Sequence, residues 1–181
     1  MKILKTVTAL LLGLTLLSAE NLQSNPSPQN DALKEYQKYN ALATQAWEKM
    51  PFSIQKYLLV AKETKGFGMY EKRKSNKYLQ GENVMVYVEP IGFGYRDLGG
   101  FYGISMESDL IIKNEKGETL GKIKSFGKFN FHSNIKNREI FLSFVISLGH
   151  APAGKYEITV PIRDNIKNQT ANITLNIEIV K

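Results

Sequence analysis

The stretch "KYEITVPIRDNIKNQTANITLNIEIV", residues 155–180, decides the fold class of this chain. Two runs within it alternate apolar residues with polar or small ones, and the turn-rich segment "RDNIKNQ" separates them. Alternation places every second side chain on one face of a strand, so each run predicts a strand that buries one face. The apolar positions are Tyr156, Ile158, Val160 and Ile162 in the first run, and Ile173, Leu175, Ile177 and Ile179 in the second.

Shorter β-rich runs precede this hairpin from residue 69 onward, and turn signals such as "NEKGE" and "APAG" separate them. Roughly seven strands with a turn every ~8–12 residues predict an antiparallel β-sandwich. No helical stretches alternate with the strands, which disfavours a parallel α/β sheet. The earlier strands are expected at residues 83–89, 101–106, 108–114, 120–126 and 139–148.

The chain before these strands has a helical character. In "NDALKEYQKYNALATQAWEKM", apolar residues recur at spacings of three and four or their multiples, with Asn30 or Asp31 as the N-cap and Pro51 ending the helix. We expect the apolar face, which includes Trp47, to dock on the protein's own domain rather than on a partner. Residues 52–66 fit a second short helix only in part. We assign residues 31–65 to a helical N-terminal extension and residues 66–181 to the β-sandwich domain.

The first nineteen residues predict export. "MKILK" supplies a basic start, an apolar run follows, and the small pair Ser18 and Ala19 ends it, which is the order of a secretory signal peptide. We expect cleavage after Ala19, and retention as an N-terminal anchor is the alternative. Residues 20–30 form a polar linker. The mature chain is therefore expected in the periplasm, or alternatively outside the cell.

Composition narrows the class of protein further. The sequence has no cysteine, so neither a disulfide nor a lipoprotein acylation site is expected. Removing Lys2 and Lys5 from the formal net charge of +7 leaves +5 for the mature form. The densest basic run, residues 71–77, is expected to be a solvated loop. The lysines are otherwise scattered along the sequence rather than clustered, which disfavours a nucleic-acid site. No stretch after the signal is long and apolar enough to span a bilayer.

Two segments carry a diffuse resemblance to known proteins. "LGHAPAGKYEITVPIRDNIKNQTANITLNIEI" resembles the final hairpin of bacterial exported immunoglobulin-like sandwich modules. The run "YLQGENVMVYVEPIGFGYRDLGGFYGISMESDLIIKNEKGETLG" is similar to uncharacterised periplasmic proteins in which a helical piece precedes the sandwich. The resemblance covers about the last two-thirds of the chain. It implies an immunoglobulin-like sandwich and a periplasmic location, but no activity, because function belongs to sites rather than to folds.

Catalytic and metal-binding motifs do not emerge from the sequence. His132 and His150 stand alone, without the ligand spacing of a zinc site, and no clustered oxygen ligands for calcium occur. A cysteine nucleophile is impossible, and no GxSxG elbow is present. We therefore expect no cofactor, no metal and no enzymatic activity.

The run "YVEPIGFGYRDLGGFYG", residues 87–103, is the most unusual stretch. Asp97 occupies the third glycine position of a GxGxxG pattern and a strand follows, so a nucleotide loop is disfavoured. The pattern favours a structural corner, with Arg96 paired to Asp97, over a ligand-contacting loop. It still offers the best candidate for a recognition surface. The candidate ligand- or partner-binding residues are Glu89, Phe93, Tyr95, Arg96, Asp97, Phe101, Tyr102 and Asp109.

These observations lead to three functional hypotheses. The first is a non-enzymatic binding or structural protein of the cell envelope, which recognises a protein or an envelope polymer through the glycine-rich stretch. The second is a small-ligand carrier with a concave pocket near Phe93, Tyr95 and Phe101. The third is a cell-wall carbohydrate hydrolase in which Glu89 and Asp109 share a cleft. The partner, the ligand and the oligomeric state are left open.

Overall fold

The computed structural model describes residues 28–181. The chain divides into two units, with the boundary between Asn40 and Ala41. The predicted export signal, residues 1–19, and most of the predicted linker lie outside the described residues. The helix in the described part of the chain is not apolar enough to cross a bilayer.

The predicted N-terminal helix is present as α1 (Pro28–Lys49). It begins earlier than expected, at a proline, which is tolerated in the first turn because the N–H group it lacks would have no intrahelical partner. It ends before Pro51, as predicted. Trp47 is buried, whereas Tyr36 and Tyr39 are exposed.

The second predicted helix, within residues 52–66, is wrong. The segment contains a strand that pairs antiparallel with β3, and this long-range pairing outweighs a helical spacing that the sequence meets only in part. β structure therefore begins at Ser53. Residues 28–181 contain nine strands, which are β1 (Ser53–Leu59), β2 (Lys77–Leu79), β3 (Val84–Ile91), β4 (Arg96–Asp97), β5 (Tyr102–Asn114), β6 (Thr119–Ser133), β7 (Leu142–Ile146), β8 (Gly154–Asp164) and β9 (Gln169–Val180).

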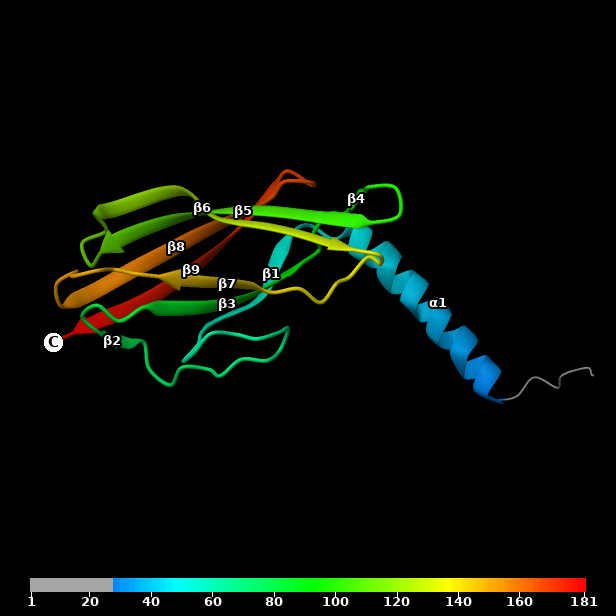
Figure 1. The fold of residues 1–181 in the computed structure, drawn as a ribbon, viewed down its shortest axis with the longest axis horizontal. Coiled ribbons are helices and arrows are strands. Elements are labelled where there is room, and N and C mark those ends of the chain that lie inside the picture. Colours follow the sequence, from blue (N-terminus) through cyan, green and yellow to red (C-terminus); the bar gives the residue numbers. More distant parts are fainter. Residues whose placement is uncertain (1–27) are drawn as a thin grey trace, which may run out of the picture. The chain divides into compact units, whose positions relative to one another are not determined.

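The strands form two sheets (Figure 1). One has three antiparallel strands in the order β1-β3-β7. The other has six, in the order β2-β9-β8-β5-β4, with β6 paired to β5. The expectation of purely antiparallel pairing is wrong at one edge, because β2 runs parallel to β9.

Several predicted strands differ in length from the observed ones. The runs expected at residues 101–106 and 108–114 are one continuous strand, β5, and the strand expected at 120–126 is the longer β6. The ladder between β5 and β6 is irregular between Ser108 and Leu110, where Ser125 of β6 has a φ of 53°. A bulge bends and twists a strand locally, which limits a long flat edge.

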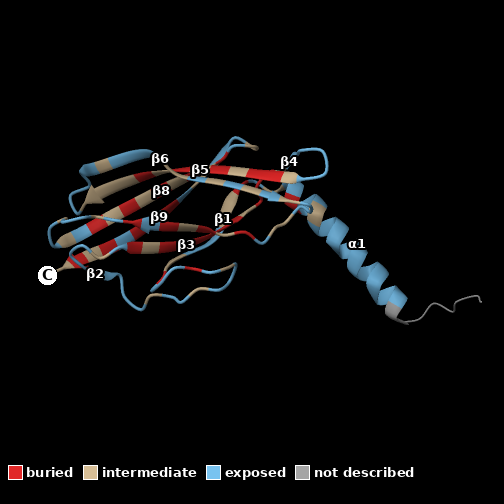
Figure 2. Cartoon of the chain, in the orientation of Figure 1, coloured by how far each residue is buried: buried red, intermediate tan, exposed pale blue. Residues whose placement is uncertain are grey.

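The alternation that predicted β8 and β9 is confirmed by burial (Figure 2). The predicted apolar positions of both strands are buried and belong to one hydrophobic cluster. That cluster also includes Val86 and Val88 of the three-stranded sheet and Ile104 and Met106 of β5. Residues of β3 and β5 between these positions therefore point away from the cluster.

Candidate functional site

The glycine-rich stretch contains the end of β3, a corner at residues 92–95, the short strand β4 and a tight turn into β5 (Figure 1). Gly92 has a φ of 69°, and a Cβ atom at this position would lie 2.5 Å from the carbonyl oxygen of Pro51. A larger residue would be strained and would clash with this backbone. The first half of the stretch is thus a structural corner, as the sequence favoured.

Phe93 belongs to the core rather than to a binding surface. It is fully buried and meets Trp47 edge to face, with 4.9 Å between the ring centroids. The indole Nε1 of Trp47 donates a hydrogen bond of 3.0 Å to the carbonyl oxygen of Phe93. The pair fastens the corner to the end of α1, so Phe93 is not available as a surface anchor.

Tyr95 and Tyr102 stand behind the corner and are half-buried. The hydroxyl of Tyr95 donates to the carbonyl oxygen of Asn137 at 2.9 Å, and burial raises the pKa of Tyr95 to about 12. The ammonium of Lys136 lies 6.0 Å from the Tyr95 ring centroid and 5.7 Å from that of Tyr102. These contacts lie within the protein, so the main role of both rings is to stabilise the corner.

Glu89 is buried on the side of β3 that faces away from the core. Its Oε1 accepts a hydrogen bond of 2.9 Å from the hydroxyl of Tyr87 and lies 3.6 Å from Nζ of Lys56. The Tyr87 hydroxyl in turn accepts the N–H of Gly68 at 2.8 Å. Glu89 therefore holds the segment after β1 against the sheet and does not line the surface near Arg96.

Asp109 lies on the other sheet, on the side of β5 away from the core. It forms a two-pronged pair with Arg163, at 3.0 and 3.2 Å, and accepts the N–H of Ser125 at 2.9 Å. Glu89 and Asp109 thus occupy different sheets, both point away from the core, and they have no partner in common. The predicted carboxylate pair in one cleft is wrong, since a register that buries Val88 and Leu110 turns both acids outward.

The second half of the stretch is a hairpin with an exposed tip. Leu98 N–H donates to Phe101 O, and Gly99 and Gly100 both have positive φ, the geometry of a two-residue turn. Asp97 accepts the N–H of Gly99 at 2.9 Å. The predicted pair between Arg96 and Asp97 is absent, because successive residues of a strand point to opposite faces.

A pocket of 410 Å³ lies beside this hairpin, and we name it the β4–β6 pocket. Arg96 is opposite Gly103 in the ladder between β4 and β5, and Gly103 is opposite His132 in the ladder between β5 and β6. These three positions therefore form one row across the sheet, with no side chain in the middle. The lining residues are Arg96, Leu98, Gly103, Ile104, Ser105, Asn130, His132 and Ile166.

Gly103 leaves room in this row for a neighbour. A Cβ atom there would lie 3.0 Å from Cδ1 of Leu98. Two residues further along the same face, Ser105 is opposite Asn130, which adds an amide to the pocket. Together the two rows present the guanidinium of Arg96, the imidazole of His132 and the amide of Asn130 around a depression, and Leu98 forms an apolar wall.

The guanidinium and the imidazole of this pocket have no side-chain partner among the described residues. Among the described residues, Arg96 forms no ion pair and no side-chain hydrogen bond, whereas Arg73 pairs with Glu82 at 2.7 Å and Arg163 with Asp109. His132 also lacks a side-chain partner in the described part of the chain. A free guanidinium has five donors in a planar fork that matches carboxylate and phosphate groups.

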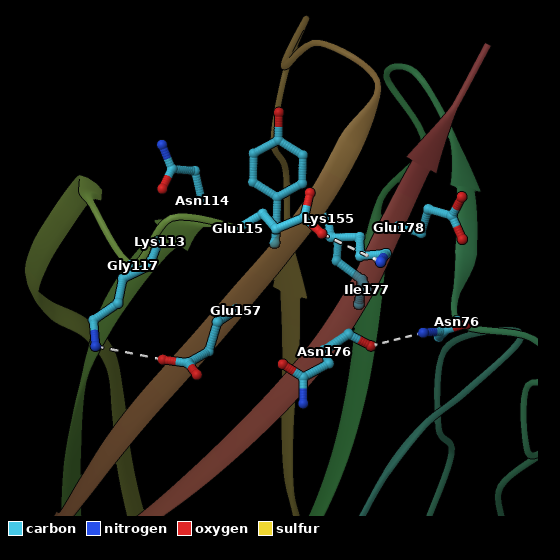
Figure 3. A pocket seen from close by; sticks show the side chains of 11 residues that line it. Asn76, Lys113, Asn114, Glu115, Gly117, Lys155, Glu157, Asn176, Ile177 and Glu178 are labelled. Carbon is cyan, nitrogen blue, oxygen red and sulfur yellow. Dashed lines mark hydrogen bonds and ion pairs between the residues drawn. The ribbon is translucent and has the colours of Figure 1, made fainter.

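A second polar pocket, of 400 Å³, differs in this respect (Figure 3). Lys113 pairs with Glu157 at 3.4 Å, and Lys155 pairs with Glu115 at 3.2 Å. The amide of Asn76 donates to the carbonyl oxygen of Asn176 at 3.0 Å. A ligand there would have to displace internal pairs, so the unpaired groups of the β4–β6 pocket make it the stronger candidate.

A smaller pocket of 230 Å³ bears on the small-ligand hypothesis. Phe93 and Tyr95 line it, as predicted, but Phe101 does not. Lys136 and Glu48, which also line it, form an ion pair of 2.8 Å. The expected concave surface therefore exists only in part, and its charged groups already have partners.

Asp164 supports one wall of the β4–β6 pocket. This fully buried carboxylate accepts the N–H groups of Gly94, Ile166 and Lys167, at 2.7, 2.8 and 3.2 Å. Next to it, Asn165 donates from its backbone to Ser105 O and from its amide to Ser105 Oγ. These bonds hold Ile166 at the edge of the pocket.

Arg96 is among the site residues that the sequence predicts, but the residues that face it are not. His132 stands alone in the sequence, and no motif there singles out Asn130, Ser105 or Gly103. The alternation of "FNFHSN" indicated which side chains share a face. Their position opposite Arg96 depends on the pairing of three strands, which no local pattern contains.

Comparison with known proteins does not identify a family. No protein-family model matches the chain, and no curated protein matches it. Among solved structures, the sporulation control protein Spo0M from Bacillus subtilis matches at 13% identity and a TM-score of 0.37, over 73% of this chain. The match covers 50% of Spo0M, so the chain spans about half of that protein's length.

Two further solved structures match at 12% identity. Superoxide reductase (neelaredoxin) from Ignicoccus hospitalis has a TM-score of 0.35, and the match covers 70% of this chain and 82% of the reductase. The CARDB domain of a Pyrococcus furiosus protein, solved in complex with di-metal ions, has a TM-score of 0.32, with 74% and 96% covered.

The comparison contradicts one prediction. We predicted that the protein is not an enzyme, and an enzyme, superoxide reductase, is among the structures matched. That prediction is withdrawn. All three TM-scores are below 0.5, so none of these likenesses transfers a fold family, an activity or a metal to this chain.

Proposed function

We propose that the protein is an exported binding protein of the bacterial cell envelope, which recognises anionic groups of an envelope polymer through the β4–β6 pocket. In this proposal the two sheets form an immunoglobulin-like sandwich that supports the pocket. The location in the periplasm rests on the signal-like residues 1–19.

One observation carries the proposal: Arg96 and His132 flank Gly103 in one row and have no partners among the described residues. A guanidinium held on a strand binds a carboxylate or phosphate through two parallel hydrogen bonds. The formal net charge, +7 for the whole chain and +5 without Lys2 and Lys5 of the signal-like segment, favours an anionic partner over a cationic one. A polymer with repeated carboxylate or phosphate groups offers such a partner.

Binding to isolated anionic envelope polymers tests this proposal. Purified full-length protein is mixed with peptidoglycan sacculi or with an acidic polysaccharide, and the bound fraction is measured by co-sedimentation at several salt concentrations. We expect Arg96→Ala to weaken binding about tenfold, the scale of a charge-assisted hydrogen-bonded pair. Arg96→Lys should restore only part of the affinity, since an ammonium cannot bind in two-pronged fashion.

Lys124→Ala is the matched control, because it also removes one exposed positive charge but lies outside the pocket. If Arg96→Ala and Lys124→Ala weaken binding equally, the effect is one of net charge and the pocket is not the site. A reporter fused to residues 1–19 tests the location separately. A fusion that stays in the cytoplasm would remove the envelope from the proposal.

A further inference from the structure

The segment between β1 and β2 forms a second exposed surface, which is independent of the β4–β6 pocket. Residues 60–74 leave the sheet and return, with isolated bridges between Val60 and Lys72 and between Gly66 and Met69. We name this segment the basic loop. Its sequence from residue 62, "KETKGFGMYEKRK", has five basic and two acidic residues.

The tip of the basic loop exposes two large apolar side chains. Phe67 is 38% exposed and Met69 is 66% exposed. Gly66 precedes Phe67, and Gly68, with a φ of 71°, separates the two side chains. The tip therefore presents two neighbouring apolar side chains and bare glycine backbone to solvent.

The tip is fixed in this exposed position. The N–H of Gly68 donates to the hydroxyl of Tyr87, a fully buried residue of β3, at 2.8 Å. The Tyr70 ring packs on the Tyr87 ring with 4.7 Å between centroids. The backbone N–H of Arg73 donates to Leu59 O at 2.9 Å. Because both ends and the turn are tied to the sheet, Phe67 and Met69 cannot fold back to bury themselves.

Unpaired lysines lie along the basic loop, with Lys65 beside the tip and Lys72 at the base, opposite Val60. Lys62 pairs with Glu71 at 2.7 Å, and Arg73 pairs with Glu82, so these charges are satisfied internally. Lys65, Lys72 and Lys74 are exposed and form no ion pair among the described residues. A hollow of 540 Å³ opens beside the tip, lined by Lys62, Glu63, Lys65, Met69, Tyr70 and Glu71 together with Gly68.

We propose that the basic loop docks on an anionic lipid surface, with Phe67 and Met69 entering the headgroup region and Lys65, Lys72 and Lys74 contacting lipid phosphates. Interfacial binding increases with the apolar area that enters the lipid and with attraction to anionic headgroups. Long lysine side chains lay their methylene groups along the apolar boundary while the ammonium reaches the phosphates. The fixed, glycine-flanked tip and the excess of lysines provide both contributions within one loop.

Site-specific fluorescence tests this docking directly, because the chain has no cysteine of its own. Phe67→Cys is labelled with an environment-sensitive dye, and the full-length protein is mixed with phosphatidylglycerol vesicles or with neutral phosphatidylcholine vesicles. We expect a blue shift and a rise in emission with the anionic vesicles, and little change with the neutral ones. The control label is placed at Leu120→Cys on β6, which is 56% exposed and close to Lys122 and Lys124.

A second measurement separates the loop from the rest of the chain. Lys65→Glu with Lys72→Glu should raise the anionic lipid concentration for half-maximal dye response about tenfold. The paired control, Lys122→Glu with Lys124→Glu, changes net charge by the same amount and should leave the response unchanged. No dye response at Phe67, an equal response at Leu120, or an equal effect of both charge reversals would each overturn the proposal.

Discussion

The carboxylate of Asp164 accepts the backbone N–H of Gly94 at 2.7 Å, which joins the turn after β8 to the glycine-rich corner after β3. The same carboxylate accepts the N–H groups of Ile166 and Lys167. One buried acid thus fixes two connections that meet at the edge of the β4–β6 pocket.

Asp164→Ala is expected to destabilise the protein by about 3 kcal/mol or more, since it leaves three backbone N–H groups without an acceptor in a buried place. Asp164→Asn should also destabilise the folded protein, because the NH2 group of asparagine would face a backbone N–H where the carboxylate now supplies an acceptor. Urea unfolding measures both. Asp97→Ala is the control, as Asp97 is exposed and accepts one N–H group. A loss for Asp164→Ala no larger than for Asp97→Ala would contradict this role.

Gly103→Val is expected to block the β4–β6 pocket while the fold persists. A Cβ atom there would lie 3.0 Å from the end of the Leu98 side chain, which can rotate away over the exposed hairpin. Valine suits a strand, so the free energy of unfolding should change by less than about 1 kcal/mol. Binding of anionic polymer should fall about tenfold. Unchanged binding by a folded Gly103→Val variant would place the ligand elsewhere.

Local sequence patterns predicted the positions of the strands more successfully than the pairing between them. Alternation in residues 155–180 located β8 and β9, because burial of one face imposes a period of two. β1 was mistaken for a helix, since its antiparallel pairing with β3 is not visible in its own residues. Arg96 could be selected from the sequence because its side chain suits anion binding. Its place in one row with His132 depends on the register of three strands, which the sequence near Arg96 does not contain.

The pair of Asp109 and Arg163 predicts how stability depends on acid. The hydrogen bond from Arg163 holds the pKa of Asp109 below its usual value. A carboxyl group with a lowered pKa stabilises the folded state above its unfolded pKa of about 4, and this stabilisation is lost as pH falls through the lower folded value. Arg163→Met should lower stability at neutral pH by about 1 kcal/mol and flatten the fall below pH ~4. Urea midpoints at neutral and acidic pH measure both effects, and an unchanged acid slope would contradict the pairing.

Burial of Tyr95 predicts the behaviour at high pH. Its pKa is raised to about 12, as are those of Tyr78 and Tyr87, chiefly because burial disfavours the charged phenolate. An unfolded chain releases these protons near pH ~10, so each residue's contribution to stability is complete below that pH and is lost as pH rises toward the folded value.

Tyrosinate absorbance of the folded chain should therefore show a late group of ionisations. Tyr95→Phe should remove one of its three members and make stability fall less steeply at alkaline pH, at the cost of the hydrogen bond to Asn137 O, about 1 kcal/mol at neutral pH. Tyr87→Phe should remove a second member and also release the N–H of Gly68 at the tip of the basic loop. If Tyr95→Phe leaves the number of late-ionising tyrosines unchanged, the Tyr95 hydroxyl ionises in contact with water. Its burial behind the corner at residues 92–95 would then be wrong.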